Sequence, residues 1–251
     1  MYNEILKIGK ITIYGYGLMI GIGFLVAVLV GMYRAKKRDM KQEAILDIAI
    51  YCILAGFLGG KLLYVIVEWK NFIANPWGVL GSAGFVVYGG IITGVLTGYI
   101  YTRIKKLSFA QYFDLVMPEI AIAQGFGRIG CFLAGCCYGA ETDLFCGVIF
   151  PEGSLAPSGV KLLPTQLFMS AGDFLIALAL ILFARKNKVD GNVGAGYLIL
   201  YGVGRFLIEF LRNDARGSVG ALSTSQFISI FIVAIGVGVF VWNTMRARKK
   251  A

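Results

Sequence analysis

The sequence predicts an all-α integral membrane protein with seven transmembrane helices, its N-terminus outside the cell and its C-terminus in the cytoplasm. Three observations predict it: an apolar composition, seven apolar stretches of bilayer length, and basic clusters after every second stretch. Of the 251 residues, 58% are apolar and 15% are charged, whereas water-soluble domains carry about 25% charged residues. The composition therefore argues against a water-soluble enzyme or binding module.

Each bilayer crossing needs about 20 mainly apolar residues, because the hydrocarbon core is about 30 Å thick and a helix rises about 1.5 Å per residue. The stretches that satisfy this are 11–33, 44–67, 84–102, 112–133, 165–184, 193–211 and 222–244. The first stretch is as long as a crossing and is followed by basic residues instead of a cleavage site. We therefore interpret it as a helix and not as a signal peptide.

The basic residues determine the predicted orientation. The chain has 24 Lys and Arg against 14 Asp and Glu, a net charge of +10. More than half of the basic residues follow the first, third, fifth and seventh stretches, in the clusters Arg34/Lys36/Lys37/Arg38/Lys41, Arg103/Lys105/Lys106, Arg185/Lys186/Lys188 and Arg246/Arg248/Lys249/Lys250. The other connections contain only Lys7, Lys10, Lys70, Lys161 and Arg216. Since positive charge marks the cytoplasmic face, topology explains the net charge and no nucleic-acid partner is expected.

We expect one polytopic domain over residues 1–251, with the long connection 135–164 packed over its outer mouth. Glycines at four-residue spacing, such as Gly56/Gly60 and Gly90/Gly94/Gly98, predict close helix packing. Packing within the chain is favoured here over dimerisation.

Charged residues inside the apolar stretches are the candidates for a functional site. A basic residue at mid-membrane costs about 2.5–3.5 kcal/mol, so it requires an interior partner or a wet cavity. The basic candidates are Lys61, Arg128, Arg205 and, nearer an outer end, Arg212, and the acidic ones are Asp114, Glu119, Asp173 and Glu209.

The sixth stretch contains the densest cluster. Steps of four place Tyr201, Arg205 and Glu209 on one helix face, and a step of seven returns Arg212 to it. An internal Arg205–Glu209 ion pair is the simpler alternative, but it explains only two of these residues.

In the fourth stretch Arg128 stands between glycines. This G-x-G-x-x-G string lacks the strand that a dinucleotide site requires. Converging Arg128 and Arg205 would suit an anionic lipid phosphate, because the planar guanidinium binds oxyanions bidentately.

Cysteine and tyrosine give weaker signals. The chain has no histidine, and four of its five cysteines, Cys131, Cys136, Cys137 and Cys146, are irregularly spaced. We therefore expect no metal site and no cofactor, while a disulfide between Cys146 and Cys136 or Cys137 stays an alternative. Tyr88 precedes Gly89 and Gly90 near the outer end of the third stretch, as either an interface anchor or a site residue.

Short motifs occur in a fixed order along the seven stretches. They are Tyr16-Gly17-Leu18-Met19, Gly59-Gly60-Lys61-Leu62-Leu63-Tyr64, Tyr88-Gly89-Gly90, Gly127-Arg128-Ile129-Gly130-Cys131-Phe132, Pro164-Thr165-Gln166-Leu167, Arg205-Phe206-Leu207-Ile208-Glu209-Phe210-Leu211-Arg212 and Leu222-Ser223-x2-Gln226. Over nearly the whole chain this series resembles the bacterial phosphatidylglycerol–prolipoprotein diacylglyceryl transferase family.

The resemblance implies a multi-pass enzyme of the bacterial cytoplasmic membrane. It would move diacylglyceryl from phosphatidylglycerol to the lipobox cysteine thiol in a preprolipoprotein signal peptide, forming a thioether and glycerol phosphate. Arg128 and Arg205 would then stabilise the phosphate leaving group, and Tyr88 or Glu209 would accept the thiol proton, unless Glu209 only orients Arg205. The substrate-binding residues expected besides the two arginines are Tyr16, Tyr201, Lys61, Arg212, Gly89 and Gly90.

The signature around Arg128 departs from the family pattern. Cys131, Ala134 and Cys136 stand where the family usually has Asn, Asn and Glu, Tyr88 stands for His, and Lys61 for Arg. These departures leave open a related lipid-using transferase with another acceptor. The buried arginines also suit a non-enzymatic transporter of anionic lipids, and Cys136-Cys137 a thiol-redox membrane protein.

Overall fold

The computed structural model describes residues 4–8, 11–214 and 217–249, so that Lys10, Arg216 and Lys250 of the predicted topology lie outside the described residues. The described chain is mainly helical. It divides into two compact units, one formed by Met1–Gly31 with Phe113–Ala251 and the other by Met32–Tyr112.

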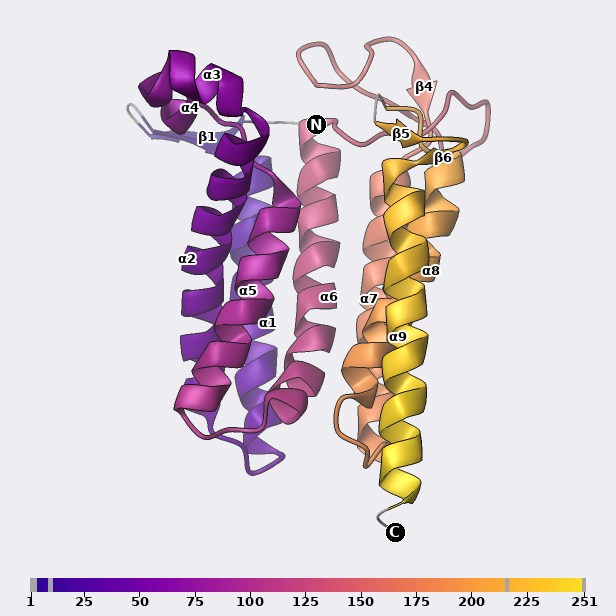
Figure 1. Ribbon diagram of the computed structural model, residues 1–251. Helices are drawn as coiled ribbons and strands as arrows, with labels where there is room; N and C mark the ends of the chain where they lie inside the picture. Colours follow the sequence, from indigo (N-terminus) through magenta and orange to yellow (C-terminus); the bar gives the residue numbers. More distant parts are fainter. Residues whose placement is uncertain (1–3, 9–10, 215–216, 250–251) are drawn as a thin grey trace. The chain divides into compact units, whose positions relative to one another are not determined.

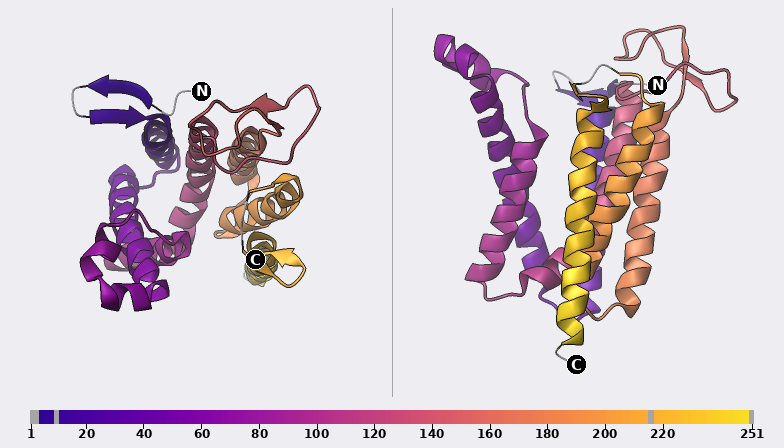
Figure 2. Two further views of the ribbon diagram at one scale, coloured as in Figure 1. Left: turned by 90° about the horizontal axis from the view of Figure 1, so that it is seen from above. Right: turned by 45° about the vertical axis from the view of Figure 1, so that its right-hand side comes forward.

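The larger unit is built on long helices. They are α1 (Gly15–Lys36), α6 (Phe109–Ala134), α7 (Thr165–Lys186), α8 (Asn192–Ile208) and α9 (Thr224–Arg248). Of these, α1 ends and α6 begins within the smaller unit. Helices α7, α8 and α9 run side by side (Figures 1 and 2). The apolar core joins α6, α7 and α8, with Ala121, Ala177, Leu180 and Tyr197 among its buried members. Small and large side chains alternate in this core, which lets the helix backbones approach one another.

Polar residues begin two of these helices. At α8 the Gly191 and Gly194 N–H groups donate to the two carboxylate oxygens of Asp114, at 2.7 and 2.8 Å. Asp114, one of the acids found inside a predicted span, therefore caps a neighbouring helix. At α9 Ser223 and Gln226 form a capping box.

The first predicted helix starts too early. Residues Ile11–Tyr14 form the strand β2, which pairs antiparallel with β1 (Glu4–Ile8), and α1 begins only at Gly15. Consecutive β-branched residues at Ile11, Thr12 and Ile13 favour the extended backbone. Hydropathy does not separate a strand from a helix at these residues, because the same apolar side chains occur in either conformation.

The smaller unit contains α2 (Gln42–Val67), α3 (Trp69–Ala74), α4 (Pro76–Gly81) and α5 (Val87–Ile104). Helices α2 and α5 pack along their length. A Cβ added to Gly89 would collide with the carbonyl oxygen of Gly59, and one added to Gly90 would lie 2.9 Å from that of Gly56. The expectation of close packing within the chain is confirmed for this helix pair. Helix α5 starts at Val87, three residues after the predicted start of its span.

Five helices are long and apolar enough to cross a membrane among the described residues: α1, α2, α7, α8 with the turn that follows it (Asn192–Leu211), and α9. Helices α5 and α6 are comparably long but more polar; α6 carries Asp114, Glu119 and Arg128. Large apolar side chains lie exposed along the helices, as at Leu58 (68%) and Trp242 (69%). Such a surface suits lipid and not water, which confirms the all-α membrane class.

The connection 135–164 has a small apolar core of its own. Its strands β3 (Val148–Ile149) and β4 (Lys161–Leu162) pair antiparallel. Phe150, Ala156 and Leu162 are buried together, and Phe132 from α6 packs against them. Figure 2 shows this segment beside the ends of α6 and α7. A second hairpin, β5 (Ser218–Val219) with β6 (Leu222–Ser223), precedes α9, so the last predicted helix also began two residues too early.

Candidate functional site

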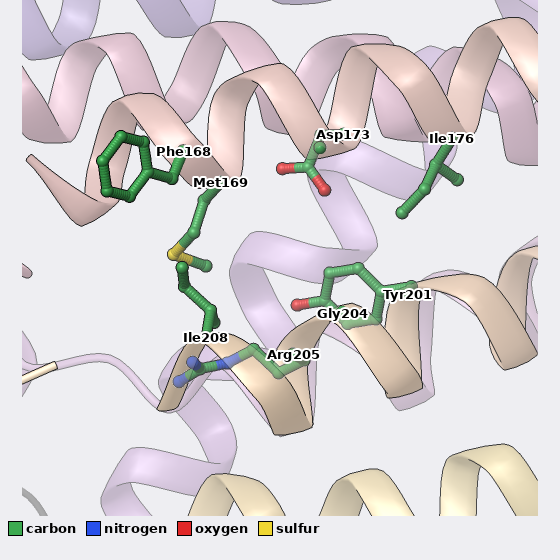
Figure 3. A pocket seen from close by; sticks show the side chains of 9 residues that line it. Phe168, Met169, Asp173, Ile176, Tyr201, Gly204, Arg205 and Ile208 are labelled. Carbon is green, nitrogen blue, oxygen red and sulfur yellow. The ribbon is translucent and has the colours of Figure 1, made fainter. Parts of the chain in front are cut away.

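A cavity of about 150 Å³ lies between α7 and α8 in the larger unit. Figure 3 shows Phe168, Met169, Asp173 and Ile176 from α7 facing Tyr201 and Arg205 from α8 across it. One wall is therefore mostly apolar, while Asp173, Tyr201 and Arg205 bring polar groups to the middle. This combination is typical of a site for an amphipathic ligand.

Arg205 is held in the cavity by two contacts. Its Nη1 donates to Glu209 Oε2 at 2.6 Å, and its Nη2 donates to Ser225 Oγ on α9 at 2.7 Å. The i, i+4 spacing on α8 places Glu209 within reach. The internal ion pair considered as the simpler alternative is thus present, and it fixes the orientation of a guanidinium that lines the cavity.

Arg128 brings a second guanidinium to this region. It lies within electrostatic range of Arg205, Tyr201 and Asp173. No hydrogen bond or salt bridge to its guanidinium is seen in the part of the chain that the structure describes. A partly buried arginine without a fixed protein partner is suited to bind an anion.

Arg212 is not on the helix face that the sequence predicts. Helix α8 ends at Ile208, a 3₁₀ turn covers Glu209–Leu211, and Arg212 has extended backbone angles (φ −90°, ψ 146°). A step of seven residues from Arg205 therefore does not return Arg212 to the same helix face, because the α-helix ends before it. Arg212 instead makes two bonds to Asp214, at 3.0 and 2.8 Å. It nevertheless stays within electrostatic range of Arg205, so three arginines gather here.

Three thiols lie next to the arginines. The Sγ atoms of Cys131, Cys136 and Cys137 are all within 4.8 Å of one another, a group that is able to hold a metal ion. All five cysteines are free thiols in this structure, which has no disulfide between Cys146 and Cys136 or Cys137. Hydrogen bonds with the Cys131 and Cys136 thiols lower the pKa of the Cys137 thiol, and the positive charges of Arg212 and Arg128 lower it further.

Two tyrosines complete the site in the larger unit. Tyr201 lines the cavity and stacks on Tyr197, with ring centroids 5.5 Å apart. Tyr16, in the first turn of α1, is exposed and lies within electrostatic range of Arg128 and of the three thiols. The structure therefore brings Tyr16, Tyr201 and the predicted arginines into one region.

The remaining predicted residues belong to the smaller unit. Tyr88 is 44% exposed in the first turn of α5, and the backbone of α2 covers Gly89 and Gly90. Lys61 Nζ donates to the carbonyl oxygens of Ser82 and Gly84, at 2.7 and 3.2 Å. Lys61 thus holds the segment that leads into α5 and Tyr88.

The sequence assigns no role to three polar residues of this region. Asp173 is among the charged candidates; it is 6% exposed, and its Oδ2 has no hydrogen-bond partner among the described residues. Ser225 and Asp214 hold the arginines, and nothing in the sequence distinguishes them from other polar residues near a helix end.

The arrangement has a clear chemical capability. Guanidinium groups that converge in a partly buried region stabilise an oxyanion whose charge increases during a reaction. The adjoining apolar wall accepts hydrocarbon. Together these features fit a lipid with a phosphate headgroup.

Comparison with known proteins gives a consistent result. The family model described as Prolipoprotein diacylglyceryl transferase matches residues 3–242. A phosphatidylglycerol–prolipoprotein diacylglyceryl transferase of Clostridium tetani is 51% identical over 242 residues, 96% of each chain. A second enzyme of that name from Clostridium perfringens is 48% identical over 97% of this chain and 96% of its own, and one from Finegoldia magna is 36% identical over 90% of each.

Proposed function

Because the chain belongs to the prolipoprotein diacylglyceryl transferase family, we propose that it transfers the diacylglyceryl group of phosphatidylglycerol to the lipobox cysteine of a prolipoprotein. The acceptor sulfur attacks the glyceryl carbon and forms a thioether. The bond from that carbon to the phosphate oxygen breaks, and its electron pair leaves with glycerol phosphate. The acceptor proton passes to a base.

One observation supports the position of the phosphate more than any other. The Arg128 guanidinium has no fixed partner among the described residues and lies within electrostatic range of Arg205, which lines the cavity. We assign Arg128 and Arg205 to the phosphate, where they stabilise the leaving group as its charge increases. Tyr16 and Tyr201 supply hydroxyl groups around it, and Arg212 adds positive charge.

Glu209 and Tyr88 have different roles in this proposal. Glu209 is bonded to Arg205 at 2.6 Å, so it orients the guanidinium. Tyr88 contacts the acceptor thiol, because it is half-exposed at the positive end of the α5 dipole, which favours a phenolate or a thiolate. Lys61 positions the segment before α5 through the Ser82 and Gly84 carbonyls. Gly89 and Gly90 let α5 approach α2.

We also propose the finer topology. The chain is a single domain of seven transmembrane helices in the bacterial cytoplasmic membrane, with α5 and α6 as the two more polar spans and the N-terminus outside. The four basic clusters support this orientation. Phosphatidylglycerol then enters from the bilayer, and the signal peptide supplies the acceptor.

A product assay tests the reaction. Membranes that contain the protein are incubated with phosphatidylglycerol and a fluorescent lipobox peptide, and mass spectrometry measures diacylglyceryl added to the peptide cysteine. Arg128→Ala should lower kcat/KM by about 100-fold or more, the usual cost of losing a preorganised oxyanion donor. Arg185→Ala, at the exposed end of α7, is the matched control and should retain activity.

Two results would contradict the proposal. Normal turnover by Arg128→Ala would remove the phosphate role of Arg128. Release of glycerol phosphate without a peptide thioether would show that the acceptor is a different molecule.

A further inference from the structure

The three-thiol cluster is created by the way α6 ends. Gly135 has a positive φ of 74°, its N–H donates to the Phe132 carbonyl at 3.2 Å, and the Cys136 N–H donates to the Cys131 carbonyl at 3.1 Å. These paired bonds are those of a Schellman motif, which brings the side chains at its C3 and C″ positions together. In this chain both positions are cysteines, Cys131 and Cys136.

The third thiol is fixed by the start of α7. Cys137 has a φ of 62°, a left-handed conformation that costs a non-glycine residue about 1 kcal/mol or more. Thr165 Oγ1 donates to the Cys137 carbonyl at 2.8 Å, and Gln166 Nε2 donates to the Cys136 carbonyl at 2.7 Å. Thr165 and Gln166 are completely buried. The backbone that carries two of the thiols is therefore held rigidly by a neighbouring helix.

The three thiols lie close enough together to reach one metal ion. Zn–S bonds of about 2.3 Å in a tetrahedron place the sulfur atoms about 3.8 Å apart, and the three Sγ atoms here lie within 4.8 Å of one another. We propose that Cys131, Cys136 and Cys137 form a binding site for a single thiophilic divalent ion, best suited to Zn²⁺.

The surrounding charges suit such a site. Three thiolates with Zn²⁺ carry a net charge of −1, and the Arg128 and Arg212 guanidinium groups lie within electrostatic range of Cys137. The arginines thus compensate the excess negative charge of a metal–thiolate centre. They also connect it electrostatically to the phosphate region.

The site has a position for one more ligand. Three protein ligands leave a fourth tetrahedral position exchangeable, as in catalytic zinc centres, and no fourth His, Cys, Asp or Glu joins the group among the described residues. A thiol that enters this position loses its proton to water and remains a thiolate. That this ligand is the acceptor cysteine rests on the proposed function; the metal site itself does not.

Metal binding tests the site without any lipid transfer. The full chain is purified in detergent, reduced, freed of metal and dialysed against Zn²⁺ or Co²⁺. One ion per chain should bind, and Co²⁺ should give a sulfur-to-metal charge-transfer band. Cys131→Ser, Cys136→Ser and Cys137→Ser should each weaken binding by about 100-fold or more, while Cys52→Ser and Cys146→Ser are the matched controls and should bind normally.

Two further readouts separate loss of the site from loss of the fold. Circular dichroism of the metal-free variants checks that they remain helical. In the wild-type protein, Zn²⁺ should protect Cys131, Cys136 and Cys137, but not Cys146, from alkylation detected by mass spectrometry. No bound ion, or equal binding by the three variants, would overturn the site.

The fourth position has its own test. A lipobox peptide with cysteine should intensify the Co²⁺ charge-transfer band, and the same peptide with serine should not. An unchanged band would overturn the exchangeable thiolate position. Peptide lipidation by a chain that binds no metal would preserve the proposed function and refute the site.

Discussion

At the residue scale, the hydrogen bond between Arg205 and Ser225 offers a direct test of how the phosphate site is organised. Ser225→Ala removes one of the two contacts that fix the guanidinium. A hydrogen bond to a charged group contributes about 1.5–3 kcal/mol, so we expect KM for phosphatidylglycerol to rise about tenfold or more with a smaller change in kcat. Steady-state kinetics in mixed micelles measures both. Ser229→Ala should leave KM within about twofold, because among the described residues its hydroxyl bonds only the Ser225 carbonyl. An equal effect of both changes would refute the contact.

A second residue-scale prediction concerns Gly139. A Cβ at this position would lie 2.7 Å from Leu163 Cβ, from Thr165 Cγ2 and from the Leu211 carbonyl oxygen. Gly139→Ala should therefore lower the free energy of unfolding by about 1–3 kcal/mol, the usual cost of overpacking. Thermal unfolding in detergent measures the loss. Gly238→Ala on α9, where nothing lies within 4 Å, should be neutral or stabilising, and a normal midpoint for Gly139→Ala would contradict the predicted collision.

The sequence selects Arg128 and Arg205 as candidates because a charge at that depth requires a compensating environment. In the structure Arg205 lines the cavity, and Arg128 lies within electrostatic range of it. The three-thiol cluster was not found. Its three cysteines come together because Gly135 has a positive φ and because Thr165 and Gln166 donate hydrogen bonds to the backbone of Cys137 and Cys136. The spacing of the cysteines in the sequence predicts neither feature.

At the element scale, the contact between α2 and α5 depends on glycines. A Cβ at Gly89 would meet the Gly59 backbone and lie 2.7 Å from Leu63 Cβ, whereas one at Gly94 would have only an ordinary contact at 3.9 Å. Gly89→Ala should separate the two helices and destabilise the protein by about 1–3 kcal/mol. Thermal unfolding in detergent compares it with Gly94→Ala, the matched control on the same helix. Equal stability of the two variants would show that α5 does not depend on this approach.

The elements themselves were predicted better than their ends. Hydropathy gives the interior of a helix because the apolar run must fill the bilayer, but it does not report where backbone bonding changes. Ile11–Tyr14 pairs with another strand, Leu222–Ser223 joins a hairpin, and Glu209–Leu211 tightens into a 3₁₀ turn. The last of these changes moved Arg212 off the predicted face of α8 and into its contact with Asp214.

At the scale of the whole molecule, the number of crossings decides where the proposed reaction takes place. Only α1, α2, α7, α8 and α9 are apolar enough by themselves among the described helices. In the proposed topology α5 and α6 also cross, which places Arg103, Lys105 and Lys106 on the side opposite to connection 135–164, as the charge pattern favours. Asp114 does not prevent α6 from crossing, since both of its carboxylate oxygens accept hydrogen bonds from backbone N–H groups.

Single-cysteine labelling in intact cells tests this arrangement. Starting from a chain without its native cysteines, we expect Lys106→Cys to be labelled by a membrane-impermeant maleimide only after lysis. Ser158→Cys, in the connection 135–164, should be labelled before lysis. Lys188→Cys, which follows the apolar helix α7, should also be labelled only after lysis if the proposed orientation holds. Labelling of Lys106→Cys and Ser158→Cys on the same side would mean that α6 does not cross, and the proposed access of Arg128 to an acceptor outside the cell would then fail with it.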